Sequence, residues 1–295
     1  MGTGRLLDWP DVAIRSTTIT ARGLRFRALS AGPESGELVL LLHGFPQTAE
    51  AWRPALTSLG DAGYRAVAVT QRGYSPGAMP EGVDAYRMSE LRDDVLAFAD
   101  ALGADRFHVV GHDWGGSVAW AVAGAAPERV ATLTAVSTPH TAALARALKH
   151  GEQRLRMAYI PVLRLPRVPE VLFDAVGGEV AVRALSLTGL DRHKAQRDVA
   201  ALREVGPGNA LNWYRAVGRG TLSRDPVRVP TLHIWGDKDP AFGRLATELT
   251  AEYVDAPYHL VELQDATHWI PDEHWDDVAD LVLEHLRDHP AKAPA

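Results

Sequence analysis

An aspartate stands in the sharp turn between a predicted strand and a predicted helix. Residues 107–116 read Phe-His-Val-Val-Gly-His-Asp-Trp-Gly-Gly, so that Gly111 and Gly115 flank Asp113. A Gly-x-nucleophile-x-Gly turn displays its central side chain at the end of a buried strand. A carboxylate in that place is suited to attack an sp3 carbon that bears a leaving group, which gives an ester of the protein itself. Taken alone, the same motif could be only a tight turn.

Two further residues could complete a catalytic group with Asp113. Asp239 follows the predicted strand 231–235, and His268 follows the predicted strand 258–263. Because open α/β sheets gather their sites at the C-terminal ends of the strands, we expect the three side chains to meet. Asp239 alone could be a turn residue, since Asp-Pro favours turns, and His268 alone could be a core histidine. Their joint occurrence favours catalysis, in which Asp239 orients His268 and His268 activates water.

That water would attack the carbonyl carbon of the Asp113 ester, so negative charge would develop on the Asp113 carbonyl oxygen. Two backbone N–H groups are expected to receive this charge, as in an oxyanion hole. One belongs to Trp114, directly after the nucleophile, and the other to Phe45, in the sequence His-Gly-Phe-Pro that follows the apolar run 37–42. That sequence could also be only a turn, but its place after a buried strand favours the functional interpretation.

Composition places the chain among ordinary globular proteins. It has 295 residues, of which 46% are hydrophobic and 23% charged, a formal charge of −6 and no cysteine. Disulfides, thiol nucleophiles and Cys-zinc sites are therefore excluded, and the acidic balance argues against a nucleic-acid partner. No apolar run is long enough to span a membrane, and the N-terminus lacks the apolar core of a signal peptide. We expect a cytoplasmic protein, monomeric or homodimeric, that acts on a small molecule.

Strands and helices alternate along most of the chain. A hairpin is predicted over 14–20 and 24–28, further strands over 37–42, 65–70, 106–110, 130–136, 231–235 and 258–263, and helices over 49–60, 89–102, 115–126 and 276–286. Ser89 is the expected N-cap of the second helix. The alternation predicts a mostly parallel sheet with helices on both faces. Strands are missing from 141–222, which reads as short helices, so we divide the chain into a core of 1–138 and 225–295 and an inserted helical cap of 139–224.

The leaving group separates two classes of substrate. A departing halide needs donors such as an indole N–H, whereas an epoxide leaves as an alkoxide, which needs a proton. Tyrosine, with a pKa of about 10, suits that second task. The inserted segment contains Tyr159 and Tyr214, the latter in the sequence Asn-Trp-Tyr-Arg. Either tyrosine could instead be a packing residue.

Three motifs together resemble the α/β-hydrolase-fold epoxide hydrolases. They are His-Gly-Phe-Pro at 43–46, Gly-His-Asp-Trp-Gly-Gly at 111–116 and Asn-Trp-Tyr-Arg at 212–215, and the order nucleophile, acid, histidine is that of the same fold. The resemblance implies an eight-stranded, mostly parallel sheet with an inserted helical cap. It also implies hydrolysis of an epoxide to a vicinal diol without a metal or organic cofactor, with Tyr159 and Tyr214 protonating the epoxide oxygen.

An apolar substrate pocket is expected under the cap, because the inserted segment is rich in Val and Leu. We place four residues beside that pocket: His43, Pro46, Trp213 and Trp269. Some positions depart from the family pattern. Thr70 and Ser75 replace the Asp and the last Gly of Asp-x-Arg-Gly-x-Gly, Thr267 replaces the glycine before the histidine, and Arg164 stands where the family often has Gln.

Several alternatives share parts of this pattern. A haloalkane dehalogenase would use the same triad, and Trp213 could hold its halide, although many such enzymes have asparagine where Phe45 stands. Fluoroacetate-type dehalogenases carry arginines just after the nucleophile, and 115–120 contains none. A serine esterase is disfavoured because Ser117 lies a helical turn beyond the motif. A non-catalytic receptor would often lack a triad member.

Overall fold

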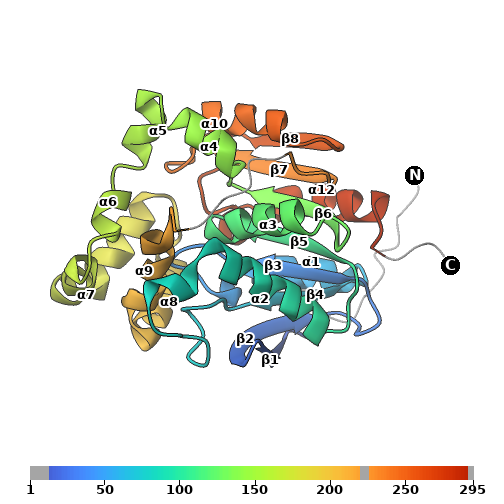
Figure 1. The fold of residues 1–295 in the computed structure, drawn as a ribbon, viewed down its shortest axis with the longest axis horizontal. Coiled ribbons are helices and arrows are strands. Elements are labelled where there is room, and N and C mark those ends of the chain that lie inside the picture. Colours follow the sequence, from blue (N-terminus) through green and yellow to red (C-terminus); the bar gives the residue numbers. More distant parts are fainter. Residues whose placement is uncertain (1–12, 220–225, 292–295) are drawn as a thin grey trace, which may run out of the picture.

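The computed structural model describes residues 13–219 and 226–291, and its centre is an eight-stranded sheet (Figure 1). The strands lie in the order β1-β2-β4-β3-β5-β6-β7-β8. Their bounds are β1 Arg15–Ala21, β2 Leu24–Ala31, β3 Leu38–Leu42, β4 Arg65–Val69, β5 Phe107–His112, β6 Val130–Val136, β7 Thr231–Gly236 and β8 Tyr258–Leu263. The strands β1, β2 and β4 pair antiparallel and all other neighbours pair parallel. The predicted strands and their mostly parallel arrangement are therefore confirmed.

The central strands are buried on both faces, as their continuous apolar sequences require. In β3, Leu40 and Leu42 face one apolar cluster, whereas Val39 and Leu41 face another on the opposite side of the sheet. The first cluster is covered by α2 (Met88–Ala101) and α3 (Trp114–Ala125), and the second by α1 (Arg53–Asp61) and α12 (Trp275–Asp288). The sheet is thus the middle layer of three.

One expected helix boundary is wrong. Ser89 is the second residue of α2, and the N-cap position is taken by Arg87, whose side chain makes no capping hydrogen bond. The short 3-10 helix η2 (Val83–Tyr86) leads directly into α2, so the chain is already turning before Ser89. The remaining short helices of the core are η1 (Ala49–Trp52), α10 (Arg244–Leu249), η3 (Thr250–Tyr253) and α11 (Ile270–Glu273).

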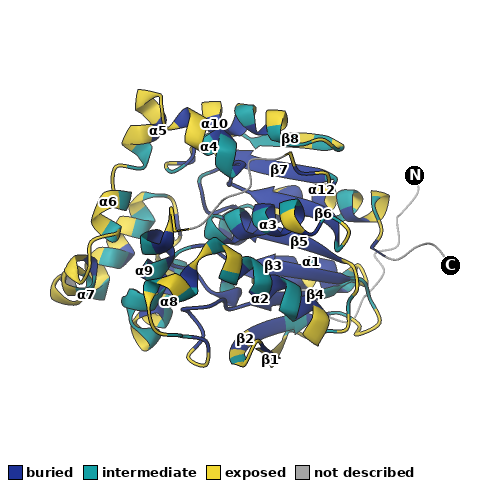
Figure 2. Cartoon of the chain, viewed as in Figure 1, coloured by how far each residue is buried: buried dark blue, intermediate teal, exposed yellow. Residues whose placement is uncertain are grey.

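Among the described residues between β6 and β7 there are six helices, which we call the inserted helices. They are α4 (Thr141–Ala147), α5 (Gly151–Arg156), α6 (Ile160–Leu163), α7 (Val168–Leu187), α8 (Arg192–Val205) and α9 (Pro207–Ala216). Figure 1 shows α6 to α9 beyond one end of the strands, and Figure 2 shows that α5, α6 and α7 are largely exposed. Gly177, at φ 70°, kinks α7. No helix within the described ranges combines the length and apolarity that crossing a bilayer requires.

Candidate active site

Asp113 lies at the junction of β5 and α3 in a backbone conformation that few residues adopt. Its φ is 52° and its ψ is −119°, a strained combination of the kind that persists at functional sites. The flanking glycines let the backbones approach. A Cβ on Gly111 would lie 2.3 Å from the carbonyl oxygen of Gly115, and a Cβ on Gly115 would lie 2.1 Å from that of Leu42. Only glycine therefore fits at positions 111 and 115, two residues before and two residues after the nucleophile.

The structure brings His268 between Asp113 and Asp239. The Nε2 atom of His268 lies 3.6 Å from Oδ2 of Asp113, and its Nδ1 atom lies 2.8 Å from Oδ2 of Asp239. Asp239 is fully buried, and its Oδ1 accepts hydrogen bonds from the N–H groups of Ala241 at 2.7 Å and Phe242 at 2.9 Å. These bonds fix the carboxylate, which in turn orients the imidazole.

The two carboxylates control the charge of His268. Burial acts to lower its pKa, but Asp239 and Asp113 outweigh this effect and raise the pKa of His268 to about 10. Burial likewise acts to raise the pKa of Asp113, and the hydrogen bond and positive charge of His268 hold that pKa below its usual range. The resting site therefore contains an ionised Asp113 beside a protonated His268.

The loop after β3 supplies a donor to the nucleophile. The N–H of Phe45 donates to Oδ1 of Asp113 at 2.9 Å. A Cβ on Gly44 would lie 2.3 Å from the Cβ of Asp113, so glycine is needed for this approach. Trp114 is the first residue of α3, where backbone N–H groups have no acceptor within the helix. Both expected oxyanion donors thus flank Asp113, and Phe45 is already bonded to it.

His43 supports this loop from behind. Its Nδ1 donates to the carbonyl of Gly44 at 2.9 Å, and its Nε2 accepts the N–H of Gln71 at 3.1 Å. The side chain of Gln71 donates to the carbonyl of His43 at 2.7 Å. Burial lowers the pKa of His43 to about 4, so the ring is neutral. With both ring nitrogens bonded to backbone, His43 lies beneath the loop. Pro46 is also buried, after a cis Phe45–Pro46 bond.

Two residues that the sequence did not single out hold the backbone of His268. The Nε2 of His112 donates to the His268 carbonyl at 2.8 Å, and the Ser137 hydroxyl donates to the same oxygen at 3.0 Å. Burial, and then the positive charge of His268, lower the pKa of His112 to about 3. The sequence could have indicated this role of His112, because a histidine at the end of a strand that is buried on both faces needs a polar partner.

Both predicted tyrosines lie near the nucleophile. Tyr214 of α9 is buried, and its ring packs edge-on against those of Phe45 at 5.4 Å and Trp114 at 5.0 Å. Burial and then the nearby Tyr159 and Asp113 raise the pKa of Tyr214. Tyr159 directly precedes α6 and is 45% exposed; partial burial and the carboxylates of Asp113 and Asp239 raise its pKa. Both hydroxyls therefore keep their protons at neutral pH.

The sequence agrees with this geometry when it is compared with known proteins. The alpha/beta hydrolase fold family matches residues 37–274. The chain belongs to that family. It is 34% identical to the AB hydrolase superfamily protein YfhM of Bacillus subtilis, over 93% of this chain and 98% of that one. It is 30% identical to epoxide hydrolase A of Mycobacterium tuberculosis, over 91% of this chain and 96% of that one.

Solved structures give the same result for this α/β hydrolase. Epoxide hydrolase A from Mycobacterium thermoresistibile superimposes with a TM-score of 0.83 at 27% identity, over 95% of this chain and all of that one. A mutant epoxide hydrolase from Bacillus megaterium, solved with its product (R)-3-[1]naphthyloxy-propane-1,2-diol, gives 0.82 at 25% identity over 92% and 100% of the two chains. The expected resemblance to α/β-hydrolase-fold epoxide hydrolases is confirmed, and the chain is a hydrolase.

Trp213 of this α/β hydrolase cannot hold a halide as the alternative requires. Its indole N–H donates to the carbonyl of Arg72 at 2.9 Å, and the side chain is buried. The expectation that this N–H is available is therefore wrong, because a core carbonyl lies opposite it. The indole N–H of Trp269 is also occupied, since it donates to the hydroxyl of Thr188 at 3.0 Å. Its ring packs against apolar residues of α7 and α8.

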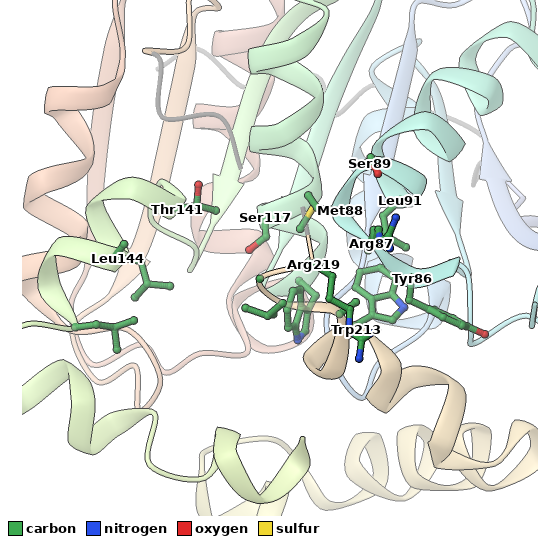
Figure 3. Close-up of a pocket in the computed structure, with 16 residues that line it drawn as sticks. Tyr86, Arg87, Met88, Ser89, Leu91, Ser117, Thr141, Leu144, Trp213 and Arg219 are labelled. Carbon is green, nitrogen blue, oxygen red and sulfur yellow. The ribbon is translucent and has the colours of Figure 1, made fainter. Parts of the chain in front are cut away.

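A pocket of about 280 Å³ is lined in part by Trp114, the residue that follows Asp113 (Figure 3). Figure 3 shows Thr141 and Leu144 on one wall and Tyr86 and Met88 on the opposite wall, with Ser117 between them. Trp114 and Trp213 also line it, whereas the pocket's lining does not include His43, Pro46 or Trp269. An apolar group bound here would lie next to the residue that follows the nucleophile.

Proposed function

We propose that this protein hydrolyses an apolar epoxide to a vicinal diol through an ester on Asp113. The observation that supports the proposal best is the position of the Asp113 carboxylate: one oxygen accepts the Phe45 N–H, and the other faces His268. The epoxide hydrolases among the relatives and structural neighbours support the same reaction class. The two tyrosines keep their protons at neutral pH, since their pKa values are raised, and are therefore available as donors to the epoxide oxygen.

In the first step, Oδ2 of Asp113 attacks an epoxide carbon while Oδ1 stays bonded to Phe45. A carbon–oxygen bond forms, the epoxide carbon–oxygen bond breaks, and its electron pair passes to the epoxide oxygen. Tyr214 and Tyr159 both donate hydrogen bonds to that oxygen, and one of them transfers its proton, so that the oxygen becomes a hydroxyl and a tyrosinate remains. Tyr214 has a fixed position between the rings of Phe45 and Trp114.

In the second step, the neutralised Asp113 no longer helps to raise the pKa of His268, so His268 passes its proton to the tyrosinate left by the first step and becomes a base. It takes a proton from water, whose oxygen attacks Cγ of Asp113. The negative charge on Oδ1 is received by the N–H groups of Phe45 and Trp114. The intermediate then collapses, and the diol oxygen leaves and takes a proton from His268. The carboxylic acid of Asp113 then gives its proton to His268, which restores the carboxylate and the protonated imidazole.

We also propose that the inserted helices act as a lid over this site and that residues 139–224 form a cap unit. Tyr159 directly precedes α6 and Tyr214 lies in α9 of this segment, whereas the triad comes from the core. Residues 220–225 of the expected unit lie outside the described part of the chain. A dehalogenase is disfavoured, because the Trp213 N–H is bonded to Arg72 and Phe45 offers no side-chain amide.

The decisive experiment compares an epoxide panel with a haloalkane panel, following diol and halide release. Diol formation is expected; halide release without any diol would overturn the proposal. With an epoxide that the wild type converts, His268→Gln should accumulate an adduct on Asp113 whose added mass equals that of the substrate. The matched control is His285→Gln, at a half-buried histidine of α12 whose charged neighbours do not include the triad. Absence of the adduct would exclude the covalent route.

A further inference from the structure

A group of polar residues, all buried except one half-buried arginine, joins α8 to the core near the Phe45 loop. We call it the polar bridge and define it as Gln47, Arg197, Asp198 and Asp272. Arg197 donates to Asp272 at 2.8 and 3.1 Å and to Asp198 at 2.8 and 3.1 Å. Nε2 of Gln47 donates to Oδ2 of Asp272 at 2.7 Å. Gln47 and Asp198 are completely buried.

The bridge contains two carboxyl groups and one arginine. Lys194, also on α8, pairs instead with Glu273 at 3.0 Å and bonds to the backbone carbonyl of Asp272. Burial raises the pKa of Asp198 to about 7, although Arg197 and Gln47 act to lower it. The amide Oε1 of Gln47 is buried and has no partner among the described residues.

The bridge is connected to both catalytic loops. Gln47 lies two residues after Phe45, and its backbone N–H donates to Gly44 at 2.9 Å, which closes the turn that carries the Phe45 N–H. Asp272 lies four residues after His268, and its N–H donates to the carbonyl of Trp269 at 3.1 Å. A single side chain, Gln47, therefore ties the turn that contacts Asp113 to α11 and, through Asp272 and Arg197, to α8.

We propose that Gln47 is a positioning residue that holds the Phe45 N–H on Oδ1 of Asp113. This inference rests on the proposed two-step reaction. Negative charge leaves Asp113 when the ester forms and returns to Oδ1 only when the ester is hydrolysed. A less well-held Phe45 N–H therefore slows hydrolysis and leaves ester formation almost unchanged, because oxyanion donors act on the step in which the charge develops. A residue with a merely structural role would affect both steps together.

The test is a single-turnover measurement on Gln47→Met, which removes the amide and nearly keeps the side-chain volume. Ester hydrolysis should fall at least about tenfold, the range expected when an oxyanion donor is weakened rather than removed, while ester formation stays within about twofold. Ester on Asp113 should then accumulate during turnover. The control, Arg27→Gln, removes another contact between α8 and the core, the Arg27–Glu204 pair at 2.8 Å, and should leave both steps unchanged. Equal slowing of the two steps, or no change in either, would overturn the inference.

A second readout needs no substrate. Hydrogen–deuterium exchange in the peptide that contains Phe45 should be faster in Gln47→Met than in the wild type or in Arg27→Gln. Unchanged exchange there would overturn the inference even if the proposed reaction holds. Conversely, faster exchange with no ester detectable on wild-type Asp113 would count against the proposed function alone. Gln47→Ala gives the same comparison should the Met variant not fold.

Discussion

The Nε2 atom of His268 lies 3.6 Å from Oδ2 of Asp113 while its Nδ1 atom bonds to Asp239 at 2.8 Å, so the imidazole lies between two carboxylates. Asp239 and then Asp113 raise the pKa of His268 to about 10. In the proposed reaction, ester formation removes the charge of Asp113 and with it part of this effect, so the first step would help to release the base that the second step needs. The resting protein holds the same group in its acidic form.

The two steps should therefore depend on pH in different ways. Ester formation needs ionised Asp113, whose pKa lies below 3.8, and should be constant between pH 5 and 8. Ester hydrolysis needs neutral His268, and its rate should rise with pH through the pKa that His268 has once Asp113 is esterified. Rapid quenching and mass spectrometry should show a larger fraction of ester at pH 5 than at pH 8. An ester fraction that is the same at both pH values would contradict this order of events.

Asp239→Asn should disable hydrolysis far more than ester formation. The amide keeps the shape of the side chain but removes the charge that orients and stabilises the imidazolium. In a comparable triad the same exchange lowers kcat roughly 10⁴-fold, and we expect a loss of about that order here. Single-turnover rates on a converted epoxide measure it. Asp237→Asn, at a neighbouring carboxylate that bonds to the Asp265 N–H, is the control.

Tyr214→Phe should slow epoxide opening by roughly 10²-fold or more, the range of general acid catalysis, and leave hydrolysis of a preformed ester within about twofold. The reason is that the tyrosine proton is needed only when the epoxide oxygen leaves. Tyr258→Phe is the matched control, since that hydroxyl bonds to His233 at 3.0 Å in the core. Equal effects of Tyr214→Phe on the two steps would remove its proposed role.

Asp198 should make stability depend on pH. Its pKa of about 7 in the folded protein lies above the ordinary value of 3.8, so folding favours the protonated form. The stabilisation is fully present below pH 4 and is lost as pH rises to about 7. Asp198→Asn should flatten that decline, measured as the free energy of unfolding in urea at pH 4.5 and pH 7.5. The control Asp255→Asn, at an exposed carboxylate, should leave the decline in unfolding free energy unchanged. If Asp198→Asn retains the full wild-type decline, Asp198 is not its source.

The elements and site residues that could be predicted from the sequence are those that a short run of adjacent residues identifies. The apolar run at β3, the turn at Asp113 and the strand ends at Asp239 and His268 are each written in a few adjacent residues. Since parallel strands end at one edge of the sheet, the meeting of the triad followed from them. The fold and the family were predictable for the same reason.

Contacts across long sequence separations were not predictable. The sequence did not show that the Trp213 indole is occupied, because its acceptor is the carbonyl of Arg72, 141 residues away. Gln47 and Asp272 are 225 residues apart, and neither stands out in its own motif. His112 acts through a backbone carbonyl, which leaves no trace in the identity of His268.

The bond between Trp213 and Arg72 fixes one of the two proposed proton donors, Tyr214, more firmly to the core than the other, Tyr159. Through this bond, and through the Asn209 contact with the Tyr86 hydroxyl at 3.0 Å, α9 is fastened to the core, and Tyr214 with it. Tyr159 instead precedes the exposed four-residue helix α6, which has no buried residue. Of the two proposed donors, one is thus fastened to the core and the other lies at an exposed position. Arg215, directly after Tyr214, bonds to the carbonyl of Leu165 at 2.9 Å and pairs with Glu170 of α7 at 2.8 Å. A redesign of α5 to α7 should therefore keep these two contacts, so that Tyr214 is not displaced.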